Sequence, residues 1–108
     1  MAVLGELEGA VMGILWSRPD GLSVRDVHAV LSADRDLAYT TVMTVLDRLA
    51  KKGLASRRLD RRAWVYQASR SRTDEVAAGV IEELGKLDPA SRAAVLDAVA
   101  KAFNSSVR

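Results

Sequence analysis

Apolar residues recur at intervals of three and four along the start of the chain, the spacing that places them on one face of a helix. The first such run is Leu4, Leu7, Val11, Ile14 and Leu15. It predicts a helix that ends near Trp16, before a Pro-Asp-Gly turn signal at residues 19–21. A second helix is predicted from Ser23 to about Ala33, because Ser23 and Asp26 have the spacing of a capping box.

A third helix is predicted over residues 38–52, and its buried stripe is formed by Val42, Val45, Leu46 and Leu49. Gly53 follows at the position where a left-handed C-cap is expected. Two short strand-like segments, 54–59 and 63–68, are joined by a tight basic turn. Three short helices followed by a β-hairpin is the order of a winged helix-turn-helix.

The spacing of apolar residues in the last third of the chain predicts two more helices. One begins at Ser71 or Thr73, the other begins at Asp88-Pro89, and residues 104–108 are expected to fray. Short helices that are apolar on one side rarely stand alone, so their stripes are expected to form a dimer contact. The residues assigned to this contact are Val76, Val80, Leu84, Val95, Leu96, Val99 and Phe103.

The expected fold class is therefore mainly α with a small β-hairpin. Residues 1–70 are expected to form the winged helix-turn-helix, and residues 71–108 a helical dimerisation region.

Charge is unevenly distributed along the chain, although the formal net charge is only +2. Residues 48–62 carry Asp60 as their single acid among seven basic residues, an excess that is typical of a polyanion-binding surface. The basic residues are Arg48, Lys51, Lys52, Arg57, Arg58, Arg61 and Arg62.

The chain has no cysteine, which excludes disulfides, thiolate metal sites and cysteine redox sensing. Its first eight residues lack the basic and apolar segments of a signal peptide. No apolar run approaches the roughly 20 residues that span a bilayer. A cytoplasmic protein without a membrane partner is expected.

The side of the third helix opposite its apolar stripe carries hydroxyl groups toward its start and cations toward its end. Threonine hydroxyls can contact phosphates or base edges, and threonine methyl groups can touch thymine. Basic side chains here and on the hairpin turn would neutralise phosphates. The residues expected to contact double-stranded DNA are Tyr39, Thr40, Thr41, Thr44, Arg48, Lys51, Lys52, Arg61 and Arg62.

Two other interpretations of this surface compete with DNA binding. A threonine-rich face flanked by cations can be an ordinary solvated helix surface. A winged helix can also act as a protein-interaction module whose basic wing binds an acidic partner, and this alternative predicts no sequence preference in a DNA shift assay.

An enzyme is not expected, because the sequence has no nucleophile–base pair, metal-ligand set or phosphate-binding loop. No metal or cofactor is expected either, since the single histidine, His28, has no second ligand at metal spacing. Trp16, Trp64 and Tyr66 are expected in the core rather than as stacking platforms.

Residues 37–54, which read LAYTTVMTVLDRLAKKGL, resemble the recognition-helix signature of the penicillinase repressor family. The segments 7–16 and 64–66 are similar to the same family, and the likeness covers about residues 4–70. The resemblance implies a homodimeric winged-helix repressor that binds a short promoter inverted repeat and dimerises through its C-terminal helices. It implies DNA contacts at Thr40, Thr41 and Thr44, with Arg48 and Lys51 near the backbone.

The sequence departs from this family in two places. Some members are inactivated by cleavage of an Asn-Phe bond, whereas the single asparagine here, Asn104, follows Phe103. Copper-responsive relatives carry a C-terminal cysteine cluster, and this chain has no cysteine. The inducer or protease that would release the protein from DNA is left open.

Overall fold

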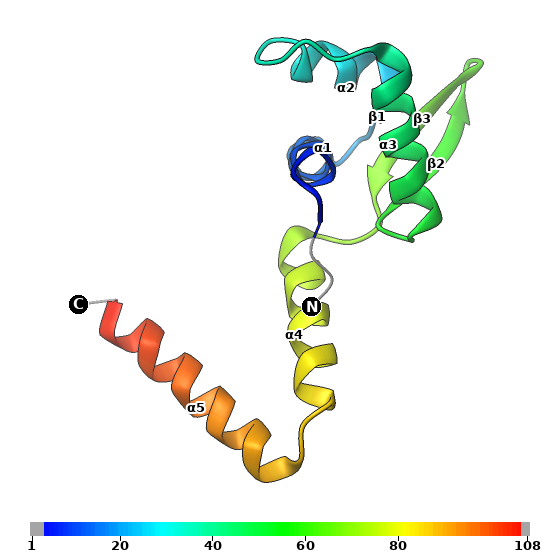
Figure 1. Cartoon of the computed structure of the whole chain (residues 1–108). Helices are drawn as coiled ribbons and strands as arrows, with labels where there is room; N and C mark the ends of the chain where they lie inside the picture. Colours follow the sequence, from blue (N-terminus) through cyan, green and yellow to red (C-terminus); the bar gives the residue numbers. More distant parts are fainter. Residues whose placement is uncertain (1–3, 107–108) are drawn as a thin grey trace. The chain divides into compact units, whose positions relative to one another are not determined.

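The computed structural model describes residues 4–106 (Figure 1). In chain order the elements are α1 (Glu6–Ser17), β1 (Leu22–Ser23), α2 (Val24–Leu31), α3 (Tyr39–Lys51), β2 (Ala55–Asp60), β3 (Ala63–Ala68), α4 (Arg72–Gly85) and α5 (Pro89–Ser106). The chain divides into two compact units at the bond between Arg72 and Thr73. We call residues 4–72 the head and residues 73–106 the tail. The expected fold class, mainly α with a small hairpin, is confirmed.

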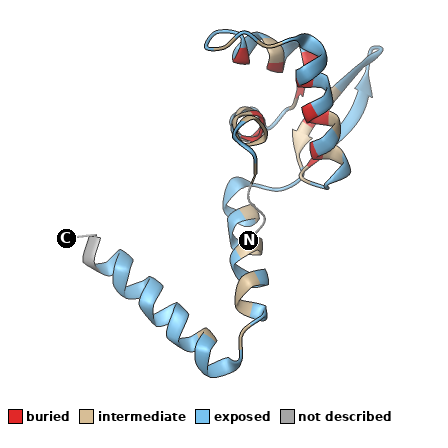
Figure 2. Ribbon diagram, in the orientation of Figure 1, coloured by how far each residue is buried: buried red, intermediate tan, exposed pale blue. Residues whose placement is uncertain are grey.

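The core of the head lies where α1, α2, α3 and the sheet meet. Its least exposed large side chains are Val11, Met12, Leu15, Val27, Val42, Leu46, Leu49 and Tyr66. The predicted stripe of α3 is confirmed, because Val42, Val45, Leu46 and Leu49 are at most 5% exposed. Figure 2 shows the buried residues of α3 along one side of the helix. The opposite side of α3 is therefore left for solvent or a partner.

The sheet of the head has three antiparallel strands in the order β1-β3-β2, so the expectation of a two-stranded wing was incomplete. Leu22 and Ser23 pair with Tyr66 and Val65 of β3. Gly21 permits this approach: its φ is +98°, and a Cβ atom there would lie 2.6 Å from a methyl carbon of Val65. A strand of two residues has no alternating pattern to detect, so only the tertiary pairing defines it.

The aromatic side chains divide between core and surface. Tyr66 is 2% exposed, as expected. Trp16 is partly buried against the core, and its indole N–H donates a hydrogen bond to the carbonyl oxygen of Arg70 at 3.1 Å. The prediction that Trp64 lies in the core was wrong, because its side chain is 44% exposed. Trp64 pairs with the exposed Leu59, closer to the hairpin turn than Tyr66, where the helices no longer cover the strand.

The tail contains the two expected helices. α4 begins at Arg72, between the two predicted starts, and α5 begins at Pro89 as predicted. The Arg92 guanidinium donates to the carbonyl oxygens of Leu84 and Leu87, both at 3.0 Å, and so ties the turn between the helices. Residues 104–106, which were expected to fray, belong to α5, and residues 107–108 lie outside the described part.

Asp88 caps the start of α5. Its carboxylate accepts a hydrogen bond from the backbone N–H of Ser91 at 3.3 Å. Hydrogen bonds from the Ser91 hydroxyl and backbone amide hold the pKa of Asp88 below its ordinary value. The capped and tied turn fixes where α5 begins.

Candidate nucleic-acid interface

Thr40, Thr41 and Thr44, which we call the threonine face, are exposed on the side of α3 away from the core. The sequence predicted this exposure from the helical period. The Thr44 hydroxyl donates to the carbonyl oxygen of Thr40 at 2.9 Å, one turn earlier in the helix. Thr44 consequently offers a partner its oxygen lone pairs and its methyl group rather than its proton.

Tyr39 is the first residue of α3, and its side chain is 45% exposed. Its ring meets the His28 ring edge-on, with 5.7 Å between the centroids. The Nε2 atom of His28 lies 2.8 Å from the carbonyl oxygen of Leu37, so His28 holds the segment that leads into α3. This contact positions Tyr39 beside the threonine face. Within residues 4–106 no group of three potential ligands is arranged to hold a metal ion.

The cations predicted on α3 differ in what they contact. Arg48 is exposed on the helix surface. Lys51 pairs with Asp47 one turn earlier, at 3.1 Å. Lys52 pairs at 2.9 Å with Glu8 of α1, whose side chain is only 13% exposed, and so fastens the end of α3 to α1. A phosphate that recruits Lys51 or Lys52 must therefore compete with a carboxylate.

Arg61 and Arg62 form the two-residue turn of the hairpin, between the paired residues Asp60 and Ala63. Their φ angles are +50° and +73°. Positive φ at both central positions is the geometry of a type I′ turn, which favours Asn-Gly. The left-handed conformation costs a non-glycine residue about 1 kcal/mol. The turn thus carries two exposed cations at a cost in stability, a pattern found at functional sites.

Replacing this turn by Asn-Gly (R61N/R62G) is expected to stabilise the head by about 1–2 kcal/mol in urea denaturation, because the backbone strain is relieved. The same variant should bind DNA more weakly, and the salt dependence of its log affinity should flatten by up to about 2, because it removes the two arginines that are expected to contact phosphates. The double variant K86Q/K101Q removes the same charge from the tail and should change neither quantity appreciably. An unchanged salt slope in R61N/R62G would show that the wing does not touch the backbone.

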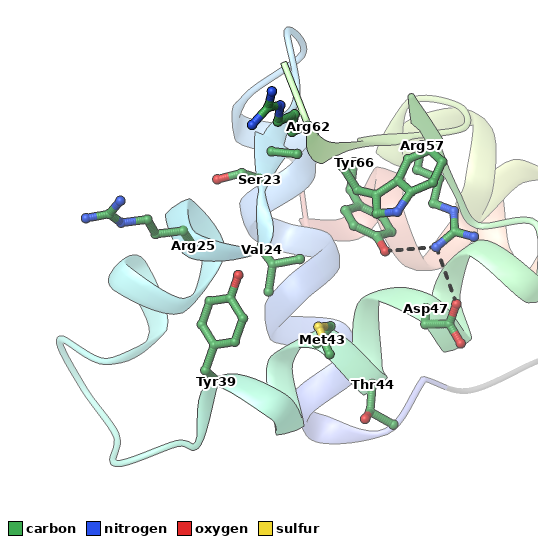
Figure 3. A pocket seen from close by; sticks show the side chains of 12 residues that line it. Ser23, Val24, Arg25, Tyr39, Met43, Thr44, Asp47, Arg57, Arg62 and Tyr66 are labelled. Carbon is green, nitrogen blue, oxygen red and sulfur yellow. Dashed lines mark hydrogen bonds and ion pairs between the residues drawn. The ribbon is translucent and has the colours of Figure 1, made fainter. Parts of the chain in front are cut away.

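A groove of about 660 Å³ opens between α3, the start of α2 and the hairpin (Figure 3). It brings together three residues predicted from the sequence: Tyr39, Thr44 and Arg62. Its wall also contains Arg57, which the sequence placed in the basic segment 48–62, and three residues that were not expected to contact DNA, namely Met43, Asp47 and Trp64. The helical period signals Met43 and Asp47, which follow Tyr39 at four-residue steps. The basic segment signalled Arg57 as a cation, but the place of Arg57 and Trp64 in the groove depends on how the sheet meets α3.

Arg57 is the most extensively contacted cation of the groove. Its guanidinium lies 4.4 Å from the centre of the Trp64 ring. One of its nitrogens donates to the Tyr66 hydroxyl at 3.4 Å and lies 3.6 Å from a carboxylate oxygen of Asp47 (Figure 3). Stacking on Trp64 and the hydrogen bond to Tyr66 hold this side chain between the hairpin and α3.

Comparison with known proteins identifies the family. The family model described as the penicillinase repressor, which represents the sequences of that family, matches residues 4–106 of the chain. The chain belongs to the penicillinase repressor family. It is 52% identical over 94 residues to the transcriptional regulator BlaI of Mycobacterium tuberculosis, an alignment that covers 86% of this chain and 68% of that protein. The resemblance seen in residues 37–54 is thereby confirmed.

Solved structures of this family share the fold of the head. The DNA-binding domain of the repressor BlaI is 27% identical with a TM-score of 0.59, over 66% of this chain and 85% of that one. The Bacillus licheniformis BlaI monomer, solved in complex with the blaP half-operator, is 26% identical with a TM-score of 0.56, over 68% and 88%. This penicillinase repressor family member is therefore a BlaI-type transcriptional repressor with a winged-helix DNA-binding fold, and not an enzyme.

A solved regulator of lower sequence identity has a similar fold. MepR of Staphylococcus aureus is 20% identical with a TM-score of 0.55, over 97% of this chain and 81% of that one. At this identity the likeness extends to the fold alone.

Proposed function

We propose that this repressor binds, as a homodimer, an inverted-repeat operator in the promoter of its target gene. The recognition helix α3 enters the major groove, and the basic wing lies along the backbone. Occupation of the promoter then blocks transcription in the cytoplasm. The proposal rests on one observation: the threonine face of α3 and the two arginines of the hairpin turn are exposed, and Thr44 and Arg62 line the same groove.

Each predicted DNA contact has a role in this proposal. Thr40, Thr41 and Thr44 meet base edges and thymine methyl groups, because they are short and lie in the first half of α3. The remaining contacts are to phosphate and sugar. They are made by Tyr39, Arg48, Lys51, Lys52, Arg61 and Arg62.

The dimer is proposed to form through residues 71–108, with residues 1–70 as the DNA-binding domain. No side chain among residues 73–104 is buried within one chain, so this part of the protein has no core of its own. The large apolar side chains assigned to the interface are 39–67% exposed, apart from the half-buried Leu84. Full burial of such a side chain contributes about 1.5–3 kcal/mol, and roughly half of that remains to be gained against a second copy, because each is already partly buried within one chain. These residues are Val76, Val80, Leu84, Val95, Leu96, Val99 and Phe103.

No membrane partner is proposed for this protein. Each helix among residues 4–106 is too short or too polar to cross a bilayer. The proposal also needs no cofactor, since the contacts to DNA are made by side chains alone.

A genome-wide pull-down of DNA bound to the full chain tests this proposal. We expect the recovered fragments to share a palindrome within promoters, with half-sites about one helical turn apart, because two heads related by a dyad read the same sequence twice. A single unpaired half-site would contradict the dimer. Fragments without a common motif, together with an acidic protein recovered in the same experiment, would favour the protein-interaction alternative.

A further inference from the structure

Asp47 is a carboxylate on the surface that is proposed to face DNA. It lies one turn after Thr44 on α3 and contributes to the groove with Thr44 and Arg57 (Figure 3). A carboxylate at this place repels phosphates, whereas the cations around it attract them. Its position therefore needs an explanation within a DNA-binding surface.

The two oxygens of Asp47 hold cations from two different elements. One oxygen lies 3.1 Å from the Lys51 ammonium on α3, and the other lies 3.6 Å from the Arg57 guanidinium on β2. Lys51 is proposed to contact phosphate, and Arg57 lines the groove together with Thr44 and Arg62, which are proposed to contact DNA. In the free protein, Asp47 therefore pairs with two cations that could otherwise bind a phosphate.

These ion pairs are open to exchange. The Asp47 and Arg57 side chains are 39% and 40% exposed, and that of Lys51 is 78% exposed. Ion pairs at such exposure are screened by water and add little stability, so a phosphate can displace the carboxylate. Arg57 keeps its place without Asp47, because Trp64 and the Tyr66 hydroxyl also hold it. Removal of the carboxylate would thus leave a positioned and unneutralised guanidinium.

We propose that Asp47 is a specificity-determining residue that competes with DNA phosphates for Arg57 and Lys51 and so limits non-specific binding. The inference rests on the proposed function of the head as a DNA-binding domain. On an unrelated duplex the protein gains only phosphate contacts, so this competition removes a large share of its affinity. On the operator, base contacts by the threonine face contribute to binding, and in this proposal Arg57 and Lys51 supply less of the binding free energy there than on an unrelated duplex. The competition therefore costs less on the operator, and the ratio of the two affinities, which determines specificity, increases.

The test compares D47N with the control D97N in the full chain. Asp97 pairs with Lys101 at 2.9 Å across one turn of α5, so D97N removes the same charge from an equivalent pair in the tail. Affinities for an unrelated duplex and for the recovered operator are measured at about 50–200 mM salt. We expect D47N to bind the unrelated duplex roughly 5- to 10-fold more tightly, with a log–log salt slope steeper by about 1–2, because one or two cations are released. Operator affinity should rise less, and D97N should stay within about twofold of the wild type.

A second variant shows whether Asp47 acts through Arg57. In the R57Q background, D47N should lose about half or more of its gain on the unrelated duplex, since one of the two released cations is then absent. Equal affinities of D47N and D97N would overturn the inference. So would a large loss of operator affinity in D47N with unchanged non-specific binding, which would mean that Asp47 itself accepts a hydrogen bond from a cytosine amino group. A wild type that prefers no DNA sequence would instead contradict the proposed function, and it would leave the comparison on unrelated DNA valid.

Discussion

Replacement of Thr40, Thr41 and Thr44 together by alanine is expected to lower operator affinity by about 100-fold, because each lost base-edge contact costs about 1 kcal/mol or more. Binding to unrelated DNA should stay within about twofold, since it depends on phosphate contacts that the variant keeps. The fold should be unaffected, because all three side chains are exposed and alanine favours a helix. Titration of both duplexes at one salt concentration, with circular dichroism of the protein, measures these effects.

Two further variants separate the chemistry of the threonine face from general effects. The triple valine variant keeps the methyl groups and removes the hydroxyls, so it should recover the part of the affinity that comes from thymine methyl contacts. T73A removes an exposed threonine from the tail and should bind like the wild type. If the triple alanine variant bound the operator as tightly as the wild type, α3 would not be the element that reads sequence.

Leu96→Asp is expected to convert the protein to a monomer at micromolar concentration. Leu96 is 51% exposed within one chain, and its substitution would place an unpaired carboxylate in the proposed interface. Because a two-fold interface contains the residue twice, the dissociation constant should rise at least about 100-fold. Operator affinity should fall as well, since the two half-sites would no longer be bound by one linked pair of heads. Sedimentation equilibrium gives the oligomeric state.

The matched control for this variant is Ala94→Asp. Ala94 is an exposed residue of α5 about 200° around the helix from Leu96, so it presents the same carboxylate on the other side. A94D should remain dimeric, and the head of L96D should retain its thermal unfolding transition. A dimeric L96D protein would place the contact elsewhere, and a monomeric A94D would indicate that the carboxylate harms the helix itself.

The helices of this repressor were largely predictable, because each depends on local signals. The stripe from Val42 to Leu49 determined both the existence of α3 and the exposure of the threonine face. The capping box at Ser23 and Asp26 is present, with both of its hydrogen bonds formed. The Asp88-Pro89 pair placed the start of α5. These features need only residues within one turn of one another, so neighbouring sequence contains all the information.

The sheet and the groove were not predictable in the same way. β1 exists only because Gly21 lets Leu22 approach Tyr66, more than forty residues later in the chain. Trp64 was wrongly expected in the core, since alternation in a strand gives the face of a residue but not how far the covering layer extends.

The sequence by itself determined the order of elements, the buried stripe of α3 and the surplus of basic residues that follows it. Only the tertiary structure decided which charges meet: Asp47 with Arg57, Lys52 with Glu8, and Arg57 with Trp64. A helical or strand period fixes the direction of a side chain relative to its own axis. Its partners depend on how that element is packed against others, and this packing is set by the core as a whole.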